Sequence, residues 1–147
     1  MADPIAPVGV MTHAQRHLVR QTLDQLRHEA EPVTLLLYGK LFELDPATRP
    51  LFHNDLMEQG RKLIATLDAI AASLDHLESV RPRLLELGRL HASYGIQPGH
   101  YETLVTALLW AFGQALGPDF DARAREAWRL ALSAVTAVMQ EGALVQQ

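Results

Sequence analysis

The feature that most constrains this chain is the helical spacing of its apolar residues, which continues from Met11 almost to the C-terminus. Apolar side chains recur at intervals of three and four residues, the period of one face of an α-helix. Alternating apolar and polar runs joined by Asn-Gly or Asp-Gly turns, which would indicate β-hairpins, do not occur in the sequence. The pattern therefore predicts an all-α domain.

Start and stop signals divide this pattern into six or seven helices. Thr12 and Gln15 resemble a capping box, Pro32 suits the first turn of a helix, and Gly95 suits a helix end. We expect long helices at about 12–29, 31–44, 55–74, 79–95, 99–116 and 120–141, with a short turn or one-turn helix between Asp45-Pro46 and Arg49-Pro50. Because the loops are short, consecutive helices must fold back on one another.

The composition is that of one ordinary globular domain. The 147 residues are 48% hydrophobic and 20% charged, and we expect a flexible leader at residues 1–10 followed by a domain at residues 11–147. The formal net charge of −4 argues against a nucleic-acid partner. The absence of cysteine excludes disulfides, cysteine-ligated metal centres and thiolate haem ligation. No signal peptide or membrane span is recognisable, so we expect a cytoplasmic protein without a membrane partner.

Polar side chains interrupt the apolar faces of three expected helices: Tyr38, Gln59 and His91. The faces read Leu35, Tyr38 and Phe42 in the second helix; Gln59, Leu63, Leu67, Ile70 and Leu74 in the third; and Leu84, Leu87, His91 and Tyr94 in the fourth. Each polar group needs a partner if it is buried. Taken singly, each has an ordinary explanation, namely a core histidine, a tyrosine with its hydroxyl at the rim, or a glutamine at the solvent edge. Together they direct three polar groups toward one interior.

Three segments resemble bacterial single-domain haem globins and the globin domains of flavohaemoglobins. They are LLLYGKLFELDPATRPLF at 35–52, QGRKL at 59–63 and LGRLHASYGIQPGHY at 87–101. The spacings between the key positions agree as a set: 14 residues from Tyr38 to Phe52, 7 to Gln59, 32 to His91 and 10 to Tyr101. The resemblance covers about residues 11–141. It implies a globin fold of six to seven helices that sandwich haem b.

The resemblance also implies a role for individual residues. His91 matches the iron ligand, Phe52 the phenylalanine that wedges against the porphyrin, and Tyr38 and Gln59 the distal pair. The further matching or expected haem-pocket residues are Leu63, one turn beyond Gln59; Gly60, where two helices cross; Tyr101, near His91; Leu87, whose carbonyl would accept from the imidazole; and Ile96. Lys62 and Arg61 could reach a haem propionate, although a solvated helix face explains them equally well.

The expected chemistry is reversible gas binding. Dioxygen on ferrous iron becomes partly anionic, so donors at Tyr38 and Gln59 would each contribute about 1.5–3 kcal/mol, or one to two orders of magnitude in affinity. Water, hydroxide or Tyr38 could fill the sixth position of ferric iron, and His53 is more plausibly solvated than a ligand.

Two departures from the family pattern affect this expectation. Ala143 stands where flavohaemoglobin-like members carry a glutamate in a His–Tyr–Glu network, with Glu141 two residues earlier. A reductase domain is also missing, so redox turnover would need an external reductase.

Other candidates have simpler explanations. His13 and His17 have the i, i+4 spacing of two metal ligands but no third ligand nearby, so we expect surface or structural histidines. Trp110, Phe112, Phe120 and Trp128 fall where the last two long helices would pack, which favours a core role.

Three functions remain open at this point. The first is a haem globin for dioxygen storage, delivery or scavenging, with high affinity through Tyr38 and Gln59. The second is a nitric oxide dioxygenase served by a separate reductase. The third is a haem-based gas sensor or a helical interaction module without haem. The expected partners are dioxygen and other diatomic gases, and the chain is expected to be a monomer or a homodimer.

Overall fold

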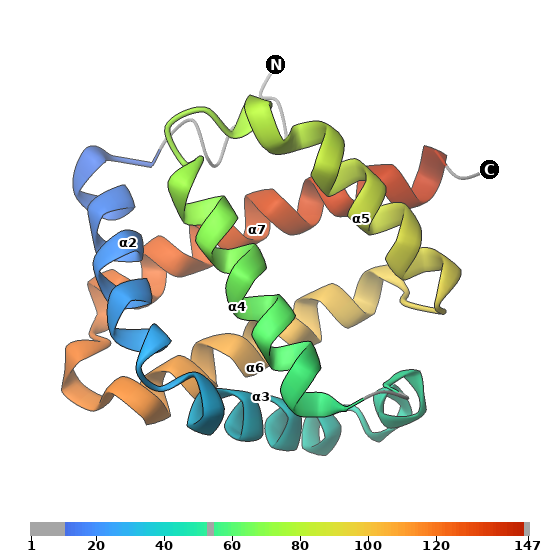
Figure 1. The fold of residues 1–147 in the computed structure, drawn as a ribbon, viewed down its shortest axis with the longest axis horizontal. Helices are drawn as coiled ribbons and strands as arrows, with labels where there is room; N and C mark the ends of the chain where they lie inside the picture. Colours follow the sequence, from blue (N-terminus) through green and yellow to red (C-terminus); the bar gives the residue numbers. More distant parts are fainter. Residues whose placement is uncertain (1–10, 53–54, 146–147) are drawn as a thin grey trace.

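The computed structural model describes residues 11–52 and 55–145, and all regular secondary structure within them is helical (Figure 1). The long helices are α2 (His13–Arg27), α3 (Ala30–Leu44), α4 (Leu56–Ala72), α5 (Arg81–Ser93), α6 (Pro98–Leu116) and α7 (Ala122–Val145), and short 3-10 helices are η1 (Pro46–Leu51), η2 (Leu77–Val80) and η3 (Gly117–Asp119). The predicted all-α class is confirmed. The expected leader at residues 1–10 lies outside the described part of the chain.

Local sequence signals explain where the helices begin and end. The capping box of α2 is present, since the Gln15 amide donates to Thr12 Oγ1 over 3.0 Å and the Thr12 amide donates to Gln15 Oε1 over 2.9 Å. Asp55 caps α4 by accepting from the Met57 amide over 2.9 Å. Gly95, with φ of 97°, turns the chain after α5, and Pro98 stands in the first turn of α6.

The core takes buried side chains from all six long helices, and its largest side chains lie where α2, α6 and α7 meet. The rings of Phe112 and Trp128 meet edge to face at 5.0 Å between centroids. The Trp128 indole donates to Thr22 Oγ1 over 2.5 Å, so the largest core side chain is also tied to α2. The predicted core role of Phe112, Phe120 and Trp128 is confirmed. Trp110, in contrast, is only half-buried, and the Lys40 ammonium lies 4.8 Å from the centroid of its ring.

Two helix pairs have the most extensive contacts. α3 packs on α6, and α5 packs on α7 (Figure 1). In Figure 1, α4 passes over α7 and α6, and α5 diverges from α4 below the link that joins them. None of the helices within 11–52 and 55–145 is long and apolar enough to cross a membrane.

Two residues assigned to inward faces point outward instead. Leu35 is 63% exposed, because the buried face of α3 is formed by Val33, Thr34, Leu37, Tyr38 and Leu41. Tyr94 is 66% exposed, because it is the C-terminal cap of α5, where the chain leaves the helix and the helical period ceases to set direction.

Candidate functional site

His91 is the centre of the site. It lies half-buried near the end of α5, and its Nδ1–H donates to the carbonyl of Leu87 over 2.8 Å. Leu87 is the acceptor expected from the sequence. The same turn is tied again by the Ile96 amide, which donates to the His91 carbonyl over 3.0 Å. With Nδ1 occupied, the imidazole is fixed in the tautomer whose Nε2 lone pair is available to a metal.

Tyr38 lies on the buried face of α3. Its side chain is 7% exposed, and its ring meets Phe52 edge to face at 5.3 Å between centroids. Burial raises the pKa of Tyr38 to about 12, so the phenol stays protonated and able to donate at neutral pH. Phe52 is half-buried at the end of the η1 corner and also contacts Phe42 at 5.8 Å between ring centroids.

Gln59 and Leu63 lie half-buried on the first turns of α4, close to α3. A Cβ atom on Gly60 would overlap the side chain of Thr34, so the two helices approach as closely as glycine allows. Thr34 lies one turn before Tyr38 and Gly60 follows Gln59, so this crossing holds the two predicted distal helices together. The predicted role of Gly60 agrees with this geometry.

An apolar cleft of about 500 Å³ opens between α4 and α5. It is lined by Ala65, Thr66, Ala69 and Ile70 of α4, by Val80, and by Pro82, Arg83, Leu84, Glu86, Leu87 and Leu90 of α5. Leu87 is the residue whose carbonyl holds His91, and Thr66 lies one turn beyond Leu63 along α4. Lys62 and Arg61 are exposed on α4. The cleft thus lies beside Leu87 and beyond Leu63 on α4, but Tyr38, Gln59, Leu63 and His91 are not among the residues that line it.

The η1 corner closes a further side of this region. A Cβ atom on Gly95 would stand 3.3 Å from Leu51 Cδ2, and His100 Nε2 lies 3.9 Å from Asp45 Oδ2. These contacts bring the end of α5 and the start of α6 to the corner that carries Phe52. The half-buried Ile96 lies in the connection between α5 and α6.

Tyr101 contributes an unusual polar atom near the start of α6. Its side chain is 5% exposed, and its buried hydroxyl has no hydrogen-bond partner among the described residues. Burial raises its pKa, so the phenol remains neutral. An orphaned donor of this kind is costly in a filled core, and a bound group or a water molecule beside it would supply the missing partner.

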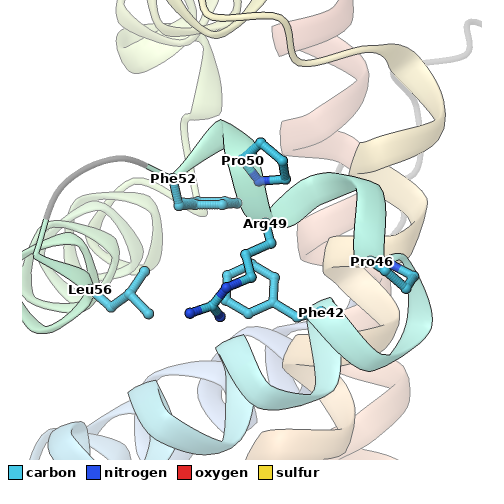
Figure 2. Close-up of a pocket in the computed structure, with 6 residues that line it drawn as sticks. All are labelled: Phe42, Pro46, Arg49, Pro50, Phe52 and Leu56. Atoms are coloured by element: carbon cyan, nitrogen blue, oxygen red, sulfur yellow. The ribbon is translucent and has the colours of Figure 1, made fainter.

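A second cavity, of about 580 Å³, lies at the η1 corner. It is lined by Phe42, Pro46, Arg49, Pro50, Phe52 and Leu56 (Figure 2). The Arg49 guanidinium carbon stands 5.1 Å from the centroid of the Phe42 ring, an arrangement that places charge over an aromatic face. Figure 2 shows Phe52 as one wall of this cavity, so the same ring borders the corner and contacts Tyr38.

Glu141 does not replace the glutamate that is missing at Ala143. Its carboxylate pairs with Arg81 at the start of α5 over 2.5 Å. Among the residues that the structure describes, neither His91 nor Tyr101 is hydrogen-bonded to a carboxylate. His91 therefore relies on a peptide carbonyl alone.

The other histidine candidates do not form a site. His13 and His17 are exposed on α2, and within 11–52 and 55–145 no cluster of three or more His, Cys, Asp or Glu could hold a metal ion. His53 lies outside the described residues.

Sequence reasoning missed the close crossing of α5 and α7. Gly88 and Gly142 stand there with Arg81 and Glu141 beside them. A glycine one turn before the predicted iron ligand was the available signal, but its partner is more than fifty residues away in the sequence.

The residues present fit a haem. The fixed imidazole with a free nitrogen, the apolar cleft between α4 and α5, and the orphaned Tyr101 hydroxyl are the features that such a group would use. The class of protein that fold and site define is an all-helical haem protein.

Comparisons with known proteins agree. The Globin family model matches residues 35–139, so the chain belongs to the globin family and is a haem globin that binds diatomic gases. Neuroglobin of Tetraodon nigroviridis is 30% identical over 146 residues, covering 90% of this chain and 92% of that protein. Neuroglobin-1 of Oncorhynchus mykiss is 26% identical with the same coverage.

A solved structure is similar over nearly the same length. It is an engineered carbene transferase from Rhodothermus marinus, provisionally described as a nitric oxide dioxygenase. It has a TM-score of 0.80 and 28% identity, and the match covers 92% of this chain and 96% of that one.

Proposed function

We propose that the protein binds haem b between α4 and α5, with His91 Nε2 as the iron ligand, and that it binds dioxygen tightly and releases it slowly. The carrying observation is the His91 ring, whose Nδ1 is held by the Leu87 carbonyl while Nε2 is left free. The α4–α5 cleft beside Leu87 and the family membership support the same assignment.

When bound, haem b supplies an iron that takes up diatomic gases. The chain's own part on the distal side is to donate hydrogen bonds. We assign the Tyr38 hydroxyl and the Gln59 amide to this role, because both lie on the two helices joined at the Thr34–Gly60 crossing. Tyr38 remains a donor because burial holds its pKa near 12.

The apolar residues of the site keep water away. Phe52, Leu63, Leu87 and Ile96 are half-buried and pack against the core, which makes them the expected contacts of the porphyrin. The exposed Lys62 is the expected partner of a haem propionate, because its apolar stem can carry the charge to the pocket edge. Tyr101 lies buried near the start of α6, where its unpartnered hydroxyl is available to a group in the pocket.

Reversible binding is the role we favour. An imidazole that donates to a carboxylate gains basicity, whereas His91 donates to a peptide carbonyl. Glu141, the acidic residue closest to the missing network position, is engaged by Arg81. Among the described residues, His91 therefore has no carboxylate partner of the kind that the flavohaemoglobin-like pattern implies for redox turnover.

Nitric oxide dioxygenation with an external reductase is the second candidate. The similarity to the Rhodothermus marinus protein, which carries that provisional description, favours it. Stopped-flow reaction of the dioxygen-loaded protein with nitric oxide, followed by turnover with a reductase, separates the two roles. Sustained turnover at a rate well above the reductase-free control supports the enzyme, and a single turnover supports storage or delivery.

The experiment that tests the proposed site uses visible spectroscopy of the hemin-loaded protein. His91→Ala should lose the ferrous spectrum of the wild type, and added imidazole should restore it. His17→Ala, which changes an exposed histidine on α2, is the matched control and should leave the spectrum unchanged. A His91→Ala protein with the wild-type spectrum, or a wild type that takes up no hemin, would refute the proposal.

A further inference from the structure

The helix that carries His91 is held mainly from one side. α5 packs on α7 and on η2, the short helix that precedes it, and has little contact with α4 across the cleft. The position of α5 relative to the distal wall therefore depends on how it is attached to α7.

That attachment is a contact between backbones. A Cβ atom on Gly88 of α5 would overlap the carbonyl of Met139 on α7, and a Cβ atom on Gly142 of α7 would overlap the carbonyl of Leu85 on α5. Each helix thus presents a glycine to a carbonyl of the other, one turn apart. Such close approach is possible only without side chains and permits Cα–H to carbonyl contacts across the crossing.

An ion pair beside the same crossing restrains α5 from sliding along α7. Arg81 in the first turn of α5 binds the Glu141 carboxylate, which precedes Gly142 on α7, over 2.5 Å. The pair is partly exposed, so we expect it to add little to the free energy of unfolding. Its expected effect is to set the position of α5 along α7.

We propose that Gly88 and Gly142 are positioning residues for iron ligation: their backbone contact sets where α5 lies, and with it where His91 presents Nε2. This inference rests on the proposed haem site. Gly88 lies one turn before His91 on the same helix, so a displacement at the crossing carries the imidazole with it. A methyl group at either glycine requires the helices to move apart, because backbone carbonyls cannot rotate away as side chains do.

The test measures the iron–imidazole stretching band of the ferrous protein by resonance Raman spectroscopy, together with the rate of hemin loss to a scavenger protein. Gly88→Ala and Gly142→Ala should each shift the band and speed hemin loss at least about tenfold, as loss of support for a metal ligand commonly does. The double variant should show less than the sum of the two single effects, since one separation relieves both overlaps.

Two other glycines provide matched controls. Gly113→Ala places a methyl group in ordinary contact, 3.8 Å from Phe120, and should leave both readouts unchanged. Gly60→Ala crowds the α3–α4 crossing instead, against the side chain of Thr34, so it should alter dioxygen release without shifting the iron–imidazole band. If the α5 or α7 glycine variants do not fold, Arg81→Gln loosens the same crossing more gently and should shift the band in a smaller degree.

The outcomes separate the two proposals. A wild type that takes up no hemin would refute both the proposed haem site and this inference, which depends on it. A wild type with normal ligation whose band is unmoved in Gly88→Ala and Gly142→Ala, or in Arg81→Gln where those variants do not fold, overturns the positioning role alone. Shifts of equal size in Gly60→Ala would also overturn it.

Discussion

At the scale of single residues, the two buried tyrosines have different surroundings. Tyr38 lies against Phe52 and Phe42 with its phenol kept neutral by burial, which suits a permanent donor. Tyr101 is equally buried, but its hydroxyl finds no partner in the described part of the chain. On the proposed haem site, Tyr38 is thus the tyrosine expected to control gas release, and substitution of Tyr101 is expected to have little effect on release.

Tyr38→Phe should release dioxygen faster, because the variant keeps the ring and loses the donated hydrogen bond. A bond to a charged acceptor is worth about 1.5–3 kcal/mol, so we expect dissociation about 10- to 100-fold faster. Stopped-flow displacement of dioxygen measures this rate. Carbon monoxide release serves as the internal control, since that ligand stays nearly neutral, and a dioxygen rate at or below that of the wild type contradicts the assignment.

The same tyrosine predicts a loss of stability at alkaline pH in the protein without hemin. Its pKa is raised from 10.0 to about 12 in the folded state, so between those values the unfolded chain releases a proton that the folded chain retains. The free energy of unfolding should therefore fall as the pH rises through this interval, by up to about 2–3 kcal/mol. Urea titrations at several pH values, compared with Tyr38→Phe, measure the effect. A difference between the two proteins that does not change with pH would contradict it.

At the scale of helices, the sequence predicted most of the helix positions but not the contacts between the helices. Caps, prolines and apolar spacing placed the long helices to within a few residues, and the last one continues to Val145 rather than ending near 141. Leu35 and Tyr94 were assigned wrongly, because spacing alone does not reveal which neighbours pack on α3 or where α5 ceases to be helical. The glycine crossing was missed for a related reason, since a close approach depends on two positions far apart in the chain.

The cap of α4 offers a test of how an element's end supports the site. Asp55→Ala removes the acceptor for the Met57 amide and should cost about 1 kcal/mol of unfolding free energy. Because Gln59 lies one turn further on, dioxygen release should also change. Thr12→Ala removes the corresponding cap of α2, away from the pocket, and should match the stability loss without altering release. Equal effects of both variants on dioxygen release would show that the release rate does not depend on the start of α4 in particular.

At the scale of the whole molecule, the interior divides into a filled part and an open part. Phe112, Trp128 and Thr22 join α6, α7 and α2 through ring contacts and a hydrogen bond. The cleft between α4 and α5 has no comparable filling among the described residues. Stability is therefore expected to be concentrated where α2, α6 and α7 meet.

Removal of hemin should make the difference in local stability between α5 and the packed interior measurable. Backbone amides of α5 should then exchange with deuterated solvent much faster than those of α6 and α7, because α5 would lose the group that fills one of its sides. Hydrogen-exchange mass spectrometry of the protein with and without hemin measures the difference. Uniform protection across the helices in the hemin-free protein would refute the division.

The separation of the cleft from the packed interior has a practical consequence for protein engineering. Substitutions at the cleft lining, such as Ala65, Thr66 and Ala69 on α4, change the space beside the proposed haem site. They leave unchanged the contacts of Trp128 with Phe112 and Thr22. Variant libraries directed to those positions should therefore vary gas selectivity over a wide range at nearly constant melting temperature. Gas affinity can thus be adjusted at this wall separately from the packing that holds α2, α6 and α7 together.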